Sequence, residues 1–258
     1  MNRSKEKIKK AFSRSATTYD HYADVQKEMA GILSEHMPDL KPKHILELGC
    51  ATGYYSAILS NNFPDAVITS LDFSEKMVET ASSHLTGDSN IHLTCRDAED
   101  FLIHCEKSFD CITSNAAIHW FDDKELAFKN IARLLNKDGV LLCTLLGPGT
   151  FHELGLALES VFNRSVTIAA ENFLSREKLA SIVSRIFRHS EIHEITIERQ
   201  YDTTLELLRK IKYTGATGGS ASVFGLGKTQ LTAMDLWFQE RYGTCRATYQ
   251  VYLIHARI

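Results

Sequence analysis

Between residues 44 and 147, short apolar runs alternate with longer stretches in which apolar residues recur three and four positions apart. The first pattern is typical of buried strands and the second of helices. Strands are predicted at residues 44–49, 67–73, 91–99, 109–115 and 139–147. Helices are predicted at residues 54–61, 74–85 and 125–135. Because strands and helices alternate, we predict an α/β fold with a mostly parallel, twisted sheet that carries helices on both faces.

The chain before this core is predicted to be helical. Across residues 11–37, apolar and aromatic side chains repeat at helical spacing, and Met29, Ala30 and Leu33 are expected to pack onto the core. Tyr19 and Gln26 share the pattern but are less easily explained by packing. We therefore keep these two residues as candidates for ligand contacts.

The chain after residue 150 has a different pattern. Helices are predicted at residues 151–162, 175–187 and 229–242, another helix from residue 205, and strands at 191–201 and 246–258. About forty residues thus separate the last two strands, more than an ordinary connection spans. We interpret this insertion as a helical cap over the active site. The single domain of residues 1–258 would then comprise an N-terminal helical segment (1–40), a cofactor-binding core (41–150) and the cap (202–243).

Composition narrows the possible classes of protein. With 258 residues, 44% hydrophobic and 24% charged, the chain suits one large soluble domain, and its net charge of −3 argues against a strongly basic nucleic-acid binder. Its apolar runs are far too short to cross a bilayer, and its charged first residues lack the apolar segment of a secretory signal. Six cysteines form no C-x-x-C pair and no metal-ligand spacing. We expect a cytoplasmic protein with reduced thiols, no metal and no membrane partner.

The stretch HILELGCATGYYS runs from the first predicted strand into a loop with the pattern Glu47-x-Gly49-x-x-x-Gly53. Glycine permits backbone angles and a close ligand approach that a side chain would block, and the next helix offers free N–H groups at its start. A dinucleotide site normally shows G-x-G-x-x-G with a pyrophosphate at that helix end, a spacing that this loop lacks. Glu47 would also repel a phosphate, but it would suit a cationic or amine-bearing ligand.

Two acids follow later strands at the same edge of the predicted sheet. Asp72 ends the second strand about 20 residues past the glycine loop, where an acid commonly bonds ribose hydroxyls. Asp97, next to Ala98 after the third strand, is placed to accept a hydrogen bond from an adenine amino group. A ligand with adenine, ribose and a positive end but no phosphate fits S-adenosylmethionine.

The segments LELGCATG, LDFS, RDAE and SNAAIHW resemble, in order, the motifs of class I methyltransferases, which have a Rossmann-like sheet. One position departs from the family pattern E-x-G-x-G-x-G, because the middle glycine is Ala51; alanine is the smallest replacement, and we expect binding to survive. The resemblance implies an S-adenosylmethionine site made of Glu47, Gly49, Cys50 and Gly53 (loop and methionine part), Asp72 (ribose), Phe73, Met77, Asp97 and Ala98 (adenine), Ser114 and Asn115 (methyl side), with Tyr19 and Gln26 from the N-terminal segment.

The flanking segments resemble a narrower family. AFSRSATTYDHYADVQKEMA and LLRKIKYTGATGGS are similar to two stretches of the malonyl-[acyl-carrier protein] O-methyltransferases, which begin pimeloyl assembly for biotin. The positions that carry this likeness are Phe12, Ser13, Arg14, Tyr19, Asp20, Ala23, Gln26, Leu208, Lys212, Gly215 and Ala216. The resemblance implies methyl transfer to the free carboxylate of a malonyl thioester held by acyl carrier protein, or by coenzyme A.

Such an acceptor has a reference pKa of about 4 and is already ionised at pH 7, so no catalytic acid or base is expected. The enzyme must instead align the reacting atoms and exclude water. Candidates for holding the substrate are Arg14, Tyr19, His119, Trp120, Arg209 and Lys212, with Lys210 nearby.

An acidic carrier protein would require a locally basic docking surface. One basic cluster comprises Lys5, Lys7, Lys9, Lys10 and Arg14, and another comprises Arg209, Lys210, Lys212 and Lys228. We favour the second, because the pantetheine arm must enter close to the transferable methyl group.

Other interpretations stay open from the sequence. A small-molecule methyltransferase acting on a quinone precursor, a lipid or a free dicarboxylic acid would share the same core. A non-catalytic cofactor-binding scaffold would be consistent with Ala51. The basic side chains would also suit an ordinary solvated face, and His119 a structural histidine.

Overall fold

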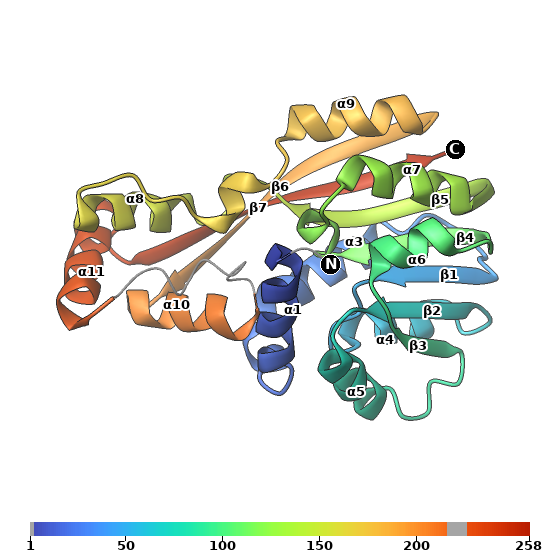
Figure 1. Cartoon of the computed structure of the whole chain (residues 1–258), viewed down its shortest axis with the longest axis horizontal. Coiled ribbons are helices and arrows are strands. Elements are labelled where there is room, and N and C mark those ends of the chain that lie inside the picture. The colour runs from blue at the N-terminus through green and yellow to red at the C-terminus, as the bar shows by residue number, and fades with distance from the viewer. Residues whose placement is uncertain (1–2, 216–225) are drawn as a thin grey trace.

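The computed structural model describes residues 3–215 and 226–258. Its centre is a seven-stranded sheet in the order β3-β2-β1-β4-β5-β7-β6, in which β7 runs antiparallel to both neighbours while β1 to β5 pair in parallel. The predicted α/β fold with a mostly parallel sheet is thus confirmed (Figure 1). The strands are β1 (His44–Leu48), β2 (Val67–Asp72), β3 (Ile91–Cys95), β4 (Phe109–Asn115), β5 (Leu135–Leu146), β6 (His189–Tyr201) and β7 (Cys245–Arg257).

Helices cover both faces of this sheet, and strand side chains on alternate positions pack against one set or the other. On β1, Ile45 packs with α3 and α4, whereas Leu46 and Leu48 lie in the core that contains α6, α7 and α9. This alternation is the period of two of a strand, and it requires helices on both faces. The helices are α1 (Arg3–Ser15), α2 (Tyr19–Tyr22), α3 (Asp24–Glu35), α4 (Tyr54–Asn62), α5 (Glu75–His84), α6 (Ala98–His104), α7 (Lys124–Leu134), α8 (His152–Phe162), α9 (Arg176–Ile186), α10 (Thr204–Tyr213) and α11 (Lys228–Tyr242), with 3-10 helices η1 (Ile118–Trp120) and η2 (Ala169–Asn172).

The N-terminal segment differs from the single helix predicted across residues 11–37. It forms three helices, because a turn in which the N–H of Thr18 donates to the carbonyl of Ser15 ends α1, and α2 and α3 follow separately. Met29, Ala30 and Leu33 are nevertheless fully buried, as predicted.

The strand predicted at residues 91–99 is also too long. It ends at Cys95, because Asp97 caps α6 by accepting a hydrogen bond from the N–H of Glu99 at 3.0 Å. Strand β5 begins at Leu135 rather than at residue 139, with a shift in its register against β4.

Strands β6 and β7 continue beyond the other strands as a two-stranded ribbon. Strand β5 pairs with β7 only over residues 251–257, whereas β6 pairs with β7 along its whole length. Because β7 is antiparallel to β5, its remaining residues 245–250 project past the carboxyl ends of the parallel strands. Helices α8, α10 and α11 pack around this ribbon, and we call the ribbon and these three helices the cap lobe (Figure 1). Helices α10 and α11 lie between the last two strands, in the position predicted for the cap.

Two further features are the apolar character of the helices and the state of the cysteines. Within residues 3–215 and 226–258, no helix has both the length and the apolar character needed to span a membrane. All six cysteines are free thiols, and all except Cys95 are buried.

Candidate active site

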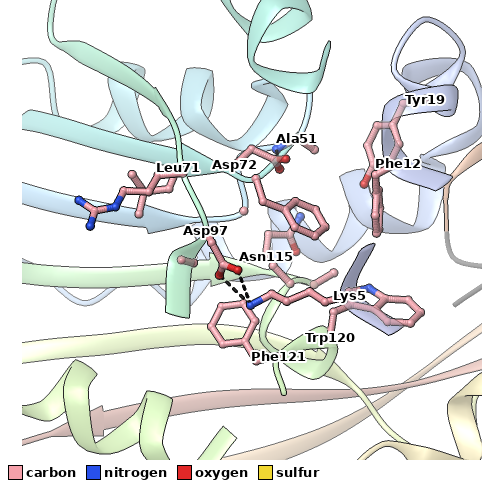
Figure 2. Close-up of a pocket in the computed structure, with 16 residues that line it drawn as sticks. Lys5, Phe12, Tyr19, Ala51, Leu71, Asp72, Asp97, Asn115, Trp120 and Phe121 are labelled. Atoms are coloured by element: carbon pink, nitrogen blue, oxygen red, sulfur yellow. Dashed lines mark hydrogen bonds and ion pairs between the residues drawn. The ribbon is translucent and has the colours of Figure 1, made fainter. Parts of the chain in front are cut away.

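A cavity lies at the carboxyl ends of the parallel strands, beneath α1 and α2. It contains about 620 Å³ of empty space, part of it open to solvent. Figure 2 shows Phe12 and Tyr19 on one side and the strand-end acids Asp72 and Asp97 on the other. We call it the strand-end cavity; its lining comprises Lys5, Phe12, Tyr19, Gly49, Ala51, Leu71, Asp72, Phe73, Arg96, Asp97, Ala98, Asn115, Ala116, Ala117, Trp120 and Phe121.

The glycine loop after β1 forms the floor of this cavity, and its glycines are required by geometry. Gly49 has φ of +83°, and a Cβ atom there would lie 2.4 Å from the Cβ of Ala117. Gly53 has φ of +88° at the start of α4, and a Cβ atom would lie 2.9 Å from the side chain of Leu85. Ala51 also has a left-handed backbone, with φ of +47°. The loop therefore exposes backbone where a ligand can approach closely.

Asp72 connects this loop to the end of β2. One carboxylate oxygen accepts the N–H of Ala51 at 3.1 Å and the other accepts the N–H of Ser74 at 2.8 Å. Burial raises the pKa of Asp72 to about 6, although these two hydrogen bonds oppose the shift. Since a carboxylate offers about four lone-pair sites, Asp72 retains the capacity to accept from the two hydroxyls of a ribose.

Glu47 lies behind the loop and does not line the strand-end cavity. One of its carboxylate oxygens accepts hydrogen bonds from the hydroxyls of Ser56 at 2.5 Å and Ser70 at 2.6 Å, so it ties α4 to β2. Burial, together with the negative charge of Asp72, raises the pKa of Glu47 to about 7, although the hydrogen bonds from Ser56 and Ser70 oppose the shift. The structure therefore gives Glu47 a role in fixing the loop rather than a direct contact with the cavity.

Asp97 and Ala98 line the cavity, but Asp97 is already paired. The ammonium group of Lys5 lies 2.7 Å from Asp97 (Figure 2). It also lies 2.5 Å from Glu99, and Lys5 is only 7% exposed. Burial lowers the pKa of Lys5, but the hydrogen bonds to these two acids outweigh that effect and raise it. The assignment of Lys5 to an exposed docking cluster is therefore wrong, because α1 turns this side chain inward.

The N-terminal helices supply further residues to the site. Tyr19 lines the strand-end cavity, and its pKa is raised by burial and by the nearby Asp72 and Asp20, so its hydroxyl stays protonated. Gln26 and Cys50 line an adjoining smaller hollow, together with Tyr19 and Asn115. The carbonyl of Gln26 accepts a hydrogen bond from the amide of Asn115 at 2.8 Å, which fixes α3 against the end of β4.

Several predicted site residues lie elsewhere. Met77 is fully buried behind the cavity, and the hydroxyl of Ser114 donates to the carbonyl of Leu48 at 2.8 Å. Arg14, Arg209 and Lys212 are exposed and do not line the strand-end cavity. Lys210 forms an ion pair with Asp24, His119 lines a second cavity, and Ala216 lies outside the described residues.

Sequence reasoning missed seven lining residues: Lys5, Phe12, Leu71, Arg96, Ala116, Ala117 and Phe121. The signal for Phe12 was present, since it belongs to the N-terminal stretch singled out above, but α1 itself was not predicted. The contact between Ala117 and Gly49 carries no local pattern, because it joins loops after two different strands.

The charges of the site favour a ligand without phosphate. Both cations in the lining are paired with acids: Lys5 with Asp97 and Glu99, and Arg96 with Asp100 at 2.9 Å. The remaining acid, Asp72, accepts hydrogen bonds from backbone groups. These residues fit a nucleoside with a positively charged end. S-adenosylmethionine is such a ligand.

Comparisons with known proteins point to the same chemistry. Residues 46–143 match a family model described as a methyltransferase domain. The malonyl-[acyl-carrier protein] O-methyltransferase of Bacillus cereus is 31% identical over 260 residues, which cover 96% of this chain and 95% of that protein. Malonyl-[acyl-carrier protein] O-methyltransferase 1 of Ilyobacter polytropus is 30% identical over 240 residues, covering 93% and 88%. The crystal structure of the YcgJ protein from Bacillus subtilis, 20% identical, shares the fold with a TM-score of 0.62 over 90% of this chain and 99% of that one.

Proposed function

Because the chain belongs to the malonyl-[acyl-carrier protein] O-methyltransferase family, we propose that it transfers a methyl group from S-adenosylmethionine to the free carboxylate of a malonyl thioester on acyl carrier protein. The product is the malonyl methyl ester from which pimeloyl assembly for biotin begins. The observation that carries this proposal is the hydrogen bond by which Asp72 accepts the N–H of Ala51 in the glycine loop, at the carboxyl ends of the strands. The chain is also related to these enzymes along nearly its whole length.

The lining of the strand-end cavity supplies the contacts that the methyl donor needs. Asp72 accepts from the ribose hydroxyls, Phe73 and Ala98 pack beside the adenine, and the loop at Gly49 approaches the methionine part. Asn115 and Tyr19, which also line this cavity, are assigned to the methyl side of the donor. Three predicted site residues are buried behind the lining and support it: Glu47, Met77 and Ser114. Glu47 and Ser114 do so by hydrogen bonds to neighbouring elements.

S-adenosylmethionine would supply a methyl group bound to a positively charged sulfur: the carboxylate oxygen would bond to the methyl carbon as the carbon–sulfur bond breaks, and that bonding pair would stay on sulfur. The protein needs no base, because the carboxylate is ionised at neutral pH. Its residues orient the acceptor, and aromatic side chains of the lining, among them Phe12, Trp120 and Phe121, exclude water. The protonated hydroxyl of Tyr19 is available as a hydrogen-bond donor to the acceptor.

The carrier protein docks, in this proposal, on the exposed basic side chains of two neighbouring helices. Helix α1 packs against α10, so Lys7 and Arg14 lie on the helix next to Arg209 and Lys212 (Figure 1). All four side chains are exposed. Complementary charge of this kind raises association rates and orients an acidic partner.

The decisive assay incubates the protein with donor carrying a labelled methyl group and with malonyl-acyl carrier protein. We expect a base-labile methyl ester on the carrier. Acetyl-acyl carrier protein is the matched control, because it has the same thioester and no free carboxylate, and it should stay unlabelled. Labelling of both carriers alike, or faster transfer to a free dicarboxylic acid, would reject the proposal.

A further inference from the structure

A second cavity adjoins the strand-end cavity and is not explained by binding of the methyl donor. It contains about 890 Å³ of empty space, part of it open to solvent. Trp120 and Phe121 line both cavities, so these aromatic side chains form the boundary between them. The rest of its lining comes from Ile8 of α1, from residues around η1, and from residues 167–173 around η2. We call it the side cavity.

His119 lines the side cavity and is 3% exposed. Its Nδ1 accepts a hydrogen bond from the N–H of Leu146 at 3.3 Å, and the rings of Trp120 and Phe173 pack against it with centroids at 5.0 and 4.7 Å. Its other ring nitrogen, Nε2, is buried and has no hydrogen-bond partner among the described residues. A buried polar atom without a partner lowers the stability of the folded state unless a ligand or a water molecule forms a hydrogen bond with it.

The protonation of His119 follows from this environment. Burial, and then the positive charge of Lys124, lower its pKa to about 3, so the ring is neutral at physiological pH. Because Nδ1 accepts a hydrogen bond, the single proton of the neutral ring is on Nε2. His119 therefore contributes an uncharged ring to the lining of the side cavity, and the hydrogen bond to the end of β5 fixes the orientation of that ring.

We infer that the side cavity receives the acyl end of the thioester substrate, and that His119 Nε2–H donates a hydrogen bond to its carboxylate; this assignment rests on the proposed function. Lys124 and Asp122 also line the side cavity, and the ammonium group of Lys124 already donates a hydrogen bond to the carbonyl of Phe121 at 2.7 Å. The neutral ring of His119 would orient the carboxylate without adding a further positive charge. An ion pair with arginine or lysine would reduce the nucleophilicity that the reaction requires. The mixed lining, with Ile168 and Phe173 beside Thr167 and Asn172, suits a chain of methylene groups interrupted by carbonyls and amides.

The test compares His119→Phe with His119→Gln in the full-length protein. His119→Phe should lower kcat/KM for malonyl-acyl carrier protein by about 10- to 100-fold, the loss of one hydrogen bond to a charged group, with unchanged affinity for S-adenosylmethionine by calorimetry. His119→Gln should recover most of the activity, because its amide also donates. His255→Phe is the matched control: its Nε2 is likewise buried without a partner in the described part of the chain, but it lies on β7 and lines neither cavity.

A second variant tests the cavity without altering the histidine. Ala169→Trp should fill part of the side cavity and raise the KM for malonyl-acyl carrier protein, whereas Ala169→Ser should not; this pair decides the matter if His119→Phe does not fold. Wild-type kinetics in a folded His119→Phe and in Ala169→Trp would overturn the inference, as would equal losses in His119→Phe and His119→Gln. The wild type is assayed first, so that its failure to methylate malonyl-acyl carrier protein rejects the proposed function itself.

Discussion

The sheet half, whose strand ends line the strand-end cavity, and the cap lobe, none of whose described residues lines it, are stabilised in different ways. The prediction that the helices between the last two strands cover the active site is therefore wrong: α1 and α2 cover it, and α10 packs beside them. On the sheet side, the positions of the site residues are set by backbone conformation and by hydrogen bonds between strand ends, as in the contacts of Asp72 with Ala51 and Ser74. On the cap side, side chains from distant segments pack together: Tyr22 stacks on Tyr213 with ring centroids 4.8 Å apart, and Gly215 lies against the ring of Phe12. The sheet side is thus held by hydrogen bonds within and between strand ends, whereas the cap side depends on contacts between separate helices.

This difference suits the two substrates of the proposed reaction. The donor has one fixed chemical form, and a rigid loop matched to it needs no rearrangement. The acceptor arrives on the arm of another protein and must enter between helices. The predictions below test this contrast, beginning with the largest effect.

Asp72→Ala should weaken binding of S-adenosylmethionine by roughly 4 kcal/mol, about a thousandfold, because two hydrogen bonds to a charged acceptor are lost. Calorimetric titration measures this directly. Asp88→Ala is the control, since Asp88 accepts from Ser60 and does not line the strand-end cavity. Donor affinity within a factor of three of the wild type would show that the sheet half does not hold the ribose.

Glu47→Gln should make the protein more stable at pH 8 and remove part of its pH dependence. The pKa of Glu47 is about 7 when folded, against an ordinary value of 4.5, so the folded state binds this proton more tightly than the unfolded state. Stability therefore falls as pH rises from about 4.5 to about 7, by about 3 kcal/mol for this group. Urea unfolding at pH 5 and pH 8 measures the change; an identical difference between the two pH values in wild type and variant would contradict it.

Gly215→Ala tests the contact between cap and N-terminal helix. Both Gly215 and Gly243 have positive φ, +71° and +73°, but an added Cβ atom meets the ring of Phe12 at 2.7 Å only in the first case. Gly243→Ala should cost the backbone strain alone, ~1–2 kcal/mol. Gly215→Ala should cost about 1–2 kcal/mol more and also weaken donor binding, since Phe12 lines the cavity. Equal losses in the two variants would show that the cap packs loosely on α1.

Replacing Arg209 and Lys212 together by glutamine should raise the KM for malonyl-acyl carrier protein about fivefold at low salt, because two exposed charges contribute about 1 kcal/mol. The effect should fade at high ionic strength, and donor affinity should not change. Lys107→Gln and Arg188→Gln, at exposed sites on the sheet half, serve together as a control of equal charge. A salt-independent effect would argue against an electrostatic docking role.

Ala51→Gly should have the smallest effect, a stabilisation of about 0.5 kcal/mol. Glycine removes the strain of a φ of +47°, worth ~1–2 kcal/mol, but loses more entropy on folding. Thermal unfolding measures it. Ala57→Gly, within α4, should instead destabilise by up to about 1 kcal/mol. If both substitutions changed stability in the same direction, the strain argument would be wrong.

Features set by interactions between residues close in sequence could be predicted, and features set by distant residues could not. The parallel strands, the glycine loop and Asp72 were predictable because each is set by local patterns: apolar runs, backbone freedom and the position of an acid at a strand end. The resemblance to a methyltransferase family rested on the same short segments. The break between α1, α2 and α3 was missed, because one helical period runs through a turn that a few hydrogen bonds impose.

The sequence by itself determined the sheet and the residues at its carboxyl edge, because strand and loop geometry depend on near neighbours. Only the tertiary structure decided that Lys5 pairs with Asp97, 92 positions away, and that His119 lines a cavity formed with η2. It also decided that Arg209 and Lys212 remain on the surface. Those outcomes depend on how separate helices pack over the sheet, and packing is selected by the fit of whole surfaces, which no short stretch of sequence specifies.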